Sequence, residues 1–195
     1  MRTRRHWQSI EAQAGLTMTE MIITMLIVGI LMGIGVPSYR YVTYSNRVST
    51  EVNSLLGDLQ YARSEAVKEG SMVTVCPSNT AQSACASGGS TAWQNGWIIF
   101  QDVNANQTVA ATSNILRVRQ AFNSQDTFVS NNSMTSVSFN REGFVSGFPS
   151  SATSSYVTIT LHTTPQKNEW TRCLQLFSTG TAATQRTSDP QGNCT

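Results

Sequence analysis

The chain has 195 residues, enough for one domain with an appendage; 39% of them are hydrophobic and only 12% are charged. Residues 1–15 contain three arginines and one acid, so residues 16–195 carry 10 basic side chains (13 − 3), 10 acidic ones (11 − 1) and no net charge. The remainder of the chain therefore offers no electrostatic basis for binding nucleic acid, which argues against that partner.

An apolar run follows the basic N-terminus. Residues 21–36 are sixteen residues without a charge, and residues 16–20 extend the run to 21. A helix needs about 20 residues to span a bilayer. The basic residues before the run predict that the N-terminus stays in the cytoplasm and that the chain after Pro37 faces the periplasm.

Glu20 lies at the start of this run. Two ordinary interpretations are a plain membrane anchor and a cleavable secretory signal that is cut after Gly33-Ile34-Gly35. Neither explains Glu20. A carboxylate in hydrocarbon costs about 2.5–3.5 kcal/mol on insertion scales, and an acid between the basic and apolar regions is not part of a signal sequence.

The residues around Glu20 resemble the processing site of type IV prepilins and pseudopilins. The matching stretches are GLTMTE, which starts at Gly15, and PSY, which starts at Pro37. The resemblance implies cleavage after Gly15 by prepilin peptidase, methylation of the new amino terminus on Leu16, and assembly roles for Glu20 and Pro37. Met18-Thr19 departs from the family, which usually carries two aliphatic residues there.

The resemblance also implies how Glu20 is used. Cleavage places a cationic amino group on Leu16, and in filaments of this family the acid of an incoming subunit pairs with the amino terminus of a neighbour. The carboxylate would then be unsatisfied in the membrane and satisfied in a filament. Residues 1–15 are predicted as a leader peptide and residues 16–37 as the transmembrane half of a long helix.

Residues 38–69 predict the amphipathic second half of that helix. Pro37 removes one backbone hydrogen bond and is expected to kink the helix. Apolar residues then recur at spacings of 4, 3, 4, 3 and 4, one face of a helix, and the charged residues, Glu51 and Asp58 among them, are expected largely on other faces. A helix over residues 16–69 is roughly 80 Å long, so its first half must protrude into a membrane or a filament core. The apolar stripe comprises Val48, Val52, Leu55, Leu59, Ala62 and Ala66.

Residues 70–195 predict a periplasmic domain of strands. Apolar and alternating runs are separated by turn residues such as Gly143, Gly147 and Gly180. One long helix followed only by strands indicates an α+β fold, with the helix lying across an antiparallel sheet. The expected strands cover residues 71–76, 96–100, 115–119, 137–140, 156–161 and 173–177.

Four cysteines, Cys76, Cys85, Cys173 and Cys194, allow three pairings. The chain has no Cys-x-x-Cys motif, so a zinc site is not expected. Disulfides in an oxidising compartment fit a periplasmic domain, and the closest spacing favours Cys76–Cys85 and Cys173–Cys194. Four free buried thiols are the alternative.

The resemblance extends into this domain. LQYARSEAVKEGSMVTVCPS (residues 59–78) and WQNGWIIFQDVNANQTV (residues 93–109) look like the GspH/FimT group of minor pilins and pseudopilins. The C-terminal spacing of Cys173, Gly180 and Cys194 is more similar to FimU-like minor pilins. Some relatives of the FimT type resemble DNA receptors and carry an arginine just after a C-terminal glycine; here only Arg186 is present in the corresponding stretch.

Other candidate sites are weaker. Residues 102–107 imitate the start of a calcium loop, but Gln107 replaces the required glycine and Ser113 the final carboxylate, so a hairpin turn is expected. His162 lies in an alternating strand and is expected to be a surface or packed residue. No catalytic motif surrounds any serine or histidine. We expect no enzymatic activity, no cofactor and no metal.

The sequence therefore predicts a minor pilin that helps to initiate or cap a type IV pilus. The alternatives are a pseudopilin of a type II secretion system and a DNA-binding pilin. The expected partners are other minor and major pilins or pseudopilins, prepilin peptidase and the inner membrane. The protein is expected to cross the inner membrane once, with its C-terminal domain in the periplasm, and to enter a filament on assembly.

Overall fold

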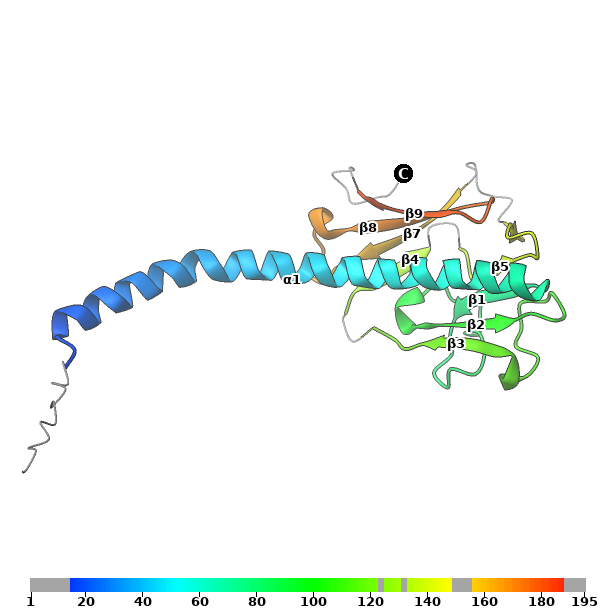
Figure 1. The fold of residues 1–195 in the computed structure, drawn as a ribbon, viewed down its shortest axis with the longest axis horizontal. Coiled ribbons are helices and arrows are strands. Elements are labelled where there is room, and N and C mark those ends of the chain that lie inside the picture. The colour runs from blue at the N-terminus through cyan, green and yellow to red at the C-terminus, as the bar shows by residue number, and fades with distance from the viewer. Residues whose placement is uncertain (1–14, 123–124, 131–132, 149–155, 188–195) are drawn as a thin grey trace, which may run out of the picture. The chain divides into compact units, whose positions relative to one another are not determined.

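The computed structural model describes residues 15–122, 125–130, 133–148 and 156–187. The chain divides into two units, one that ends at Val42 and one that starts at Thr43. A single α-helix, α1 (Met18–Glu69), has 52 residues and belongs to both units (Figure 1). Pro37, which we expected to kink the helix, lies inside it, and the helix continues on both sides.

Local signals explain where α1 begins and ends. Thr17 directly precedes the first turn, and its hydroxyl oxygen accepts the backbone N–H of Glu20 at 3.3 Å, as the first residue of a capping box does. Gly70 follows the last turn with a φ of +64°, the left-handed conformation that glycine adopts readily and that ends many helices. The long helix expected from the sequence is confirmed.

The second half of α1 is buried on the side predicted by its apolar stripe. All six stripe residues are at most 1% exposed. Two acids share this buried face: Glu51 is 8% exposed and Asp58 is 1% exposed. The expectation that charged residues lie on other faces was therefore wrong for these two, because partners from the strands accompany Asp58, as described below.

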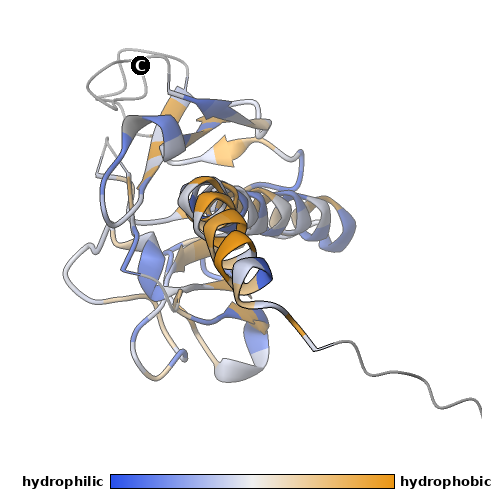
Figure 2. Cartoon of the chain, turned by 90° about the vertical axis from the view of Figure 1, so that its left-hand side faces the viewer, coloured by the Kyte–Doolittle hydropathy of each residue, from blue (hydrophilic) through white to orange (hydrophobic). Residues whose placement is uncertain are grey.

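Two antiparallel sheets pack with this half of the helix, where the sequence led us to expect one (Figures 1 and 2). The first has the order β3-β2-β1-β5-β6 and the second the order β4-β7-β8-β9. The strands of the first are β1 (Val73–Pro77), β2 (Trp97–Gln101), β3 (Ile115–Arg119), β5 (Val137–Phe139) and β6 (Val145–Ser146). Those of the second are β4 (Thr127–Ser130), β7 (Tyr156–His162), β8 (Arg172–Phe177) and β9 (Ala182–Arg186).

Three strands, β4, β6 and β9, were not expected. β6 has only two residues, and β9 is a polar edge strand whose residues are almost all exposed. Neither strand therefore shows the alternation of apolar and polar residues by which a strand is predicted from sequence. Short 3₁₀ turns complete the fold: η1 (Trp93–Asn95), η2 (Thr112–Asn114) and η3 (Asn168–Trp170).

The main core lies between the second half of α1 and the inner faces of both sheets. Its largest side chains, Trp93, Trp97, Phe128 and Phe139, are fully buried. A smaller apolar cluster forms on the other face of the first sheet, where Cys76, Ile98 and Phe100 pack together with three half-buried neighbours. These two clusters bury both faces of β1 and β2, which explains their nearly continuous apolar sequences.

Candidate functional site

The candidate site is the apolar half of α1, which we define as residues 18–42. Every residue from Gly15 to Thr43 is exposed. The large apolar side chains in this segment are 45–85% exposed, and they colour the segment orange in Figure 2. Among the described residues, α1 is the one helix long and apolar enough to cross a membrane. An exposed apolar surface of this extent indicates contact with lipid or with other proteins.

Glu20 lies in the first turn of this segment. Its backbone N–H donates to the carbonyl oxygen of Thr17 at 3.1 Å and to the Thr17 hydroxyl at 3.3 Å. Its carboxylate has no hydrogen-bond or ion-pair partner among the described residues. The helix dipole favours an acid at this end by about 0.3–1 kcal/mol. That is less than the about 2.5–3.5 kcal/mol that transfer of a carboxylate into hydrocarbon would cost, so the helix dipole alone would not offset such a transfer.

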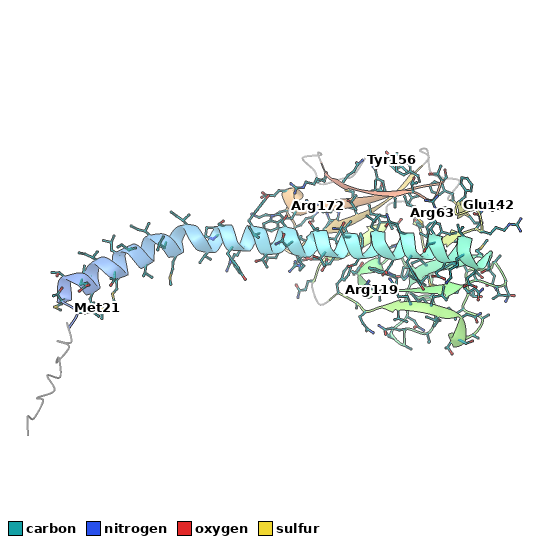
Figure 3. The ribbon with its side chains drawn as sticks, in the orientation of Figure 1. Met21, Arg63, Arg119, Glu142, Tyr156 and Arg172 are labelled. Carbon is teal, nitrogen blue, oxygen red and sulfur yellow. A yellow bond between two sulfur atoms is a disulfide. The ribbon has the colours of Figure 1, made fainter. Side chains whose placement is uncertain are left out.

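The predicted processing site lies just before α1. Gly15 and Leu16 are exposed and precede the helix, and nothing lies within 4 Å of the position that a Cβ on Gly15 would take. Within the described chain, this backbone is thus open to a peptidase. Met21, labelled in Figure 3, marks the first turns of the helix that follow.

The second half of α1 is fastened to the first sheet by Asp58. Its carboxylate accepts the indole N–H of Trp97 at 2.9 Å, the Arg117 guanidinium at 2.8 Å and the Arg119 guanidinium at 3.1 Å. Arg117 also lies over the ring of Tyr61, 4.0 Å from its centroid. A buried carboxylate is stable only when it is paired and hydrogen-bonded, and this arrangement supplies both.

A second ion pair fastens α1 near the start of its buried half. Arg47 donates two hydrogen bonds to the carboxylate of Asp126, at 2.7 and 2.8 Å, in the bidentate geometry that makes such pairs strong. The Asp126 side chain is fully buried and also accepts the backbone N–H of Thr164 at 2.9 Å. These contacts hold the two sheets on residues 43–69 of α1, whereas residues 18–42 are exposed.

Sequence reasoning missed both ion pairs. The available signal was the alternation of Arg117 and Arg119 along β3, which places two cations on one face of a strand. Asp58 lies one residue before the stripe residue Leu59 and therefore close to the buried face. Neither signal identifies the partner, because the two segments are about 60 residues apart in the chain.

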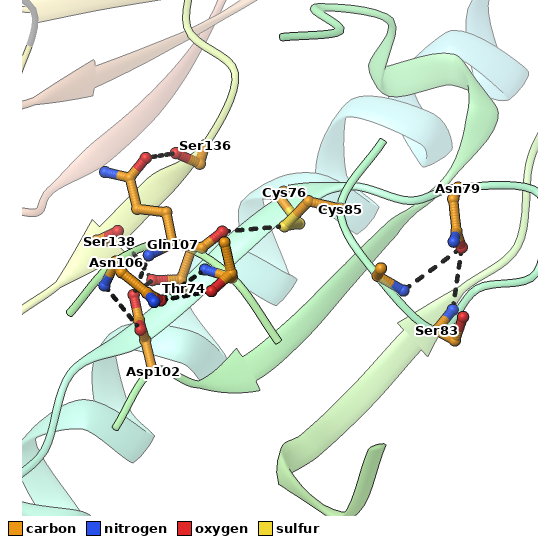
Figure 4. Close-up of a disulfide and its surroundings, with 12 residues drawn as sticks. Thr74, Cys76, Asn79, Ser83, Cys85, Asp102, Asn106, Gln107, Ser136 and Ser138 are labelled. Carbon is orange, nitrogen blue, oxygen red and sulfur yellow. Dashed lines mark hydrogen bonds between the residues drawn. A yellow bond between two sulfur atoms is a disulfide. The ribbon is translucent and has the colours of Figure 1, made fainter. Parts of the chain in front are cut away.

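The disulfide between Cys76 and Cys85 is present, as predicted (Figure 4). It closes a loop in which the Asn79 side chain accepts the backbone N–H groups of Ser83 and Ala84. Cys194 lies outside the described residues, so its pairing with Cys173 remains a prediction.

The calcium-like stretch is a turn in the connection between β2 and β3. The Asp102 carboxylate accepts the backbone N–H of Asn106 at 3.1 Å, the backbone N–H of Gln107 at 2.8 Å and the Thr74 hydroxyl at 3.1 Å (Figure 4). Asp102 is 2% exposed. Its oxygens thus organise the turn. Among the described residues, no group of three or more His, Cys, Asp or Glu side chains could hold a metal ion.

Two further residues from the sequence analysis have clear positions. His162 ends β7, is half-buried and lies 3.3 Å from the amide nitrogen of Gln166; burial lowers the pKa of its imidazole. Arg186 ends β9 and is exposed. Within the described part of residues 180–195, Arg186 is the one basic residue. Phosphate binding by nucleic-acid partners needs clustered cations, so this stretch does not favour a DNA receptor.

An exposed apolar half-helix joined to an α+β domain defines a pilin-like structural protein. The sequence profile described as "Type II transport protein GspH" matches residues 51–180, more than half of the chain. The chain therefore belongs to the GspH family of pseudopilins and minor pilins, which are structural proteins and not enzymes.

Solved structures agree with this assignment at the level of the fold. The type IV minor pilin FimU of Pseudomonas aeruginosa strain PAO1 is similar in two crystal forms, each with 20% sequence identity. One has a TM-score of 0.54 over 72% of this chain and 89% of FimU, and the other a TM-score of 0.51 over 70% and 91%. No curated protein matches.

Proposed function

We propose that the chain is a minor pilin that helps to initiate or cap a type IV pilus together with other minor and major pilins. One observation carries this proposal. The Glu20 carboxylate, unpartnered among the described residues, lies at the start of an exposed apolar half-helix on a GspH-family domain. A cationic amino terminus of a neighbouring subunit would satisfy this acid, and the apolar side chains around it would pack in a filament core.

The same proposal gives the route of the subunit. The apolar half of α1 holds the chain in the inner membrane in a single pass, with the domain in the periplasm. Prepilin peptidase cuts after Gly15 and methylates Leu16. Pairing of Glu20 with the amino terminus of a neighbour then draws the subunit from the membrane into the filament. Gly15, Leu16 and Glu20 are all exposed, which supports both the cleavage step and the pairing step.

A pseudopilin of a type II secretion system is the second candidate. The family description, a type II transport protein, favours it. The name of FimU, a type IV minor pilin, favours the pilus. Both machines use a processed apolar helix, so this part of the chain does not distinguish them.

Mass spectrometry of sheared, washed pili tests the proposal. We expect peptides from residues 51–180 at low copy number relative to the major pilin. Deletion of the gene is expected to reduce surface piliation and to leave protein secretion intact. If the subunit is absent from pili and its deletion blocks secretion across the outer membrane, the second candidate replaces the first.

A further inference from the structure

A polar pocket lies between α1 and the edge of the second sheet. Its cavity is about 240 Å³, large enough for a small group such as a carboxylate. All but one of its lining residues are polar or charged. They are Ser49, Val52 and Asn53 from α1, Arg172 from β8, and Thr184, Gln185 and Arg186 from β9.

Two arginines meet at this pocket. Arg172 and Arg186 are directly opposite each other in the pairing of β8 with β9, so their side chains start from the same face of the sheet. Like charges in opposite positions of neighbouring strands destabilise a sheet. An anion placed beside the exposed Arg186 would be attracted by its guanidinium and would lie near that of Arg172.

The two arginines are held differently. Arg172 is 6% exposed and donates to the carbonyl oxygens of Glu169 and Thr171 and to the hydroxyl of Ser45, so its position is set by the fold (Figure 3). Arg186 is exposed and has no acidic partner among the described residues. The pocket thus combines one fixed cation with one that is available to a ligand.

The lining residues include no acid. The side chains of Ser49, Asn53, Thr184 and Gln185 add hydroxyl and amide donors. The pocket therefore has the chemistry to bind one oxyanion.

We propose that this pocket binds a carboxylate, supplied by an acidic side chain of a neighbouring filament subunit. A guanidinium matches a carboxylate in bidentate geometry. A single cavity with two cations lacks the row of cations that a nucleic-acid backbone requires. Asn53 of α1 and Thr184, Gln185 and Arg186 of β9 are exposed, so an acidic side chain of a neighbour can reach this side of the pocket. The identity of the partner rests on the proposed function.

Binding is tested on the processed full chain in detergent. The probe is sodium acetate, and the readout is the NMR signal of the Arg186 Nε–H group. We expect a saturable shift of this signal with acetate, no such shift with chloride, and loss of the response in Arg186→Gln. Arg141→Gln is the matched control, because Arg141 is exposed, lies away from this pocket in the turn between β5 and β6, and among the described residues pairs with the exposed Glu142. Absence of a saturable shift would refute the proposal that this pocket binds a carboxylate. A response to a single-stranded oligonucleotide far stronger than to acetate would overturn the carboxylate assignment.

The neighbouring subunit is tested in pili. We expect Arg186→Glu to reduce incorporation about tenfold, which corresponds to about 1.4 kcal/mol, and Arg141→Glu to leave it unchanged. Arg186→Lys keeps the charge without the bidentate geometry, so its incorporation should fall between the two. If wild-type protein is absent from pili, the proposed function fails first. If wild type and Arg186→Glu are incorporated equally, this inference alone fails.

Discussion

Arg63 of α1 donates its Nε–H to the carbonyl oxygen of Gly143, 2.9 Å away. The same guanidinium reaches the carbonyl oxygen of Thr179 at 3.3 Å. Gly143 lies in the turn between β5 and β6, and Thr179 lies in the turn between β8 and β9, so one side chain of the helix joins the two sheets (Figure 3 labels Arg63). The two turns also approach each other directly, since the carbonyl oxygen of Gly143 lies next to the position that a Cβ on Gly180 would take.

Gly180→Ala should destabilise the domain by about 2–3 kcal/mol. Gly180 has a φ of +80°, and a Cβ there would clash with the carbonyl oxygen of Gly143, so both conformational strain and steric repulsion oppose the change. Urea denaturation of the full chain in detergent, followed by near-UV circular dichroism, measures the effect.

Gly57→Ala is the control for this substitution. Gly57 lies inside α1 with nothing within 4 Å of a Cβ, and alanine is the better helix former. We expect a gain in stability of about 0.5–1 kcal/mol. A common loss at both glycines would show that the clash at Gly180 is not the cause.

Asp58→Asn should lower stability by about 1–3 kcal/mol. The substitution keeps the shape of the side chain but removes the charge shared by Arg117 and Arg119, and it places an amide donor among donors. The arginine side chains are 44% and 40% exposed, so water offsets part of the loss. The urea midpoint of the full chain is the measurement.

Glu142→Gln is the matched control for Asp58→Asn. Its side chain is 51% exposed and pairs with an exposed arginine, so we expect a change below about 0.5 kcal/mol. An effect as large as that of Asp58→Asn would mean that burial of the carboxylate does not explain the difference.

The mature protein should begin at Leu16 with a methylated amine. Gly15 is exposed and presents no side chain to a peptidase, and the motif before Glu20 is of the prepilin type. Amino-terminal sequencing and intact mass of the membrane-extracted protein decide the point. A chain that begins at Val36 would support an ordinary secretory signal instead.

Glu20→Gln should reduce incorporation into filaments without changing the stability of the domain. Glu20 lies outside the unit that starts at Thr43, and its backbone N–H, not its carboxylate, bonds to Thr17. We therefore expect a change in stability below about 0.5 kcal/mol. Quantitative mass spectrometry of purified pili measures incorporation.

Glu20→Ala should behave in the same way, because both substitutions remove the partner of a neighbouring amine. Both variants should be processed and should remain in the membrane. Equal amounts of wild type and Glu20→Gln in purified pili would show that charge pairing is unimportant for this subunit.

Two disulfides are expected in the mature protein. Removal of the first with the double substitution Cys76→Ala and Cys85→Ala should cost up to about 3 kcal/mol by loop entropy. Peptide mapping without reduction should yield a Cys76–Cys85 peptide and a Cys173–Cys194 peptide. Recovery of a Cys76–Cys173 peptide would refute this pairing of the four cysteines.

The sequence by itself determined the long helix, its exposed and buried halves, six of the strands and the Cys76–Cys85 disulfide. These features are local: a charge-free run, a repeat of apolar residues at helical spacing, alternation in strands, and two cysteines nine residues apart. The Glu20 motif is local as well, and a resemblance over a few residues was enough to predict membership of the pilin class.

The tertiary structure alone decided how the strands divide into two sheets and which charges are buried. β9 carries almost no apolar pattern because nearly all of its side chains are exposed, so its place in the sheet depends on its backbone pairing with β8. Asp58 is buried because Arg117 and Arg119, about 60 residues later in the chain, supply the compensating charge. Arg172 and Arg186 line one pocket because the pairing of β8 with β9 places them opposite each other. No periodicity in either segment encodes that register.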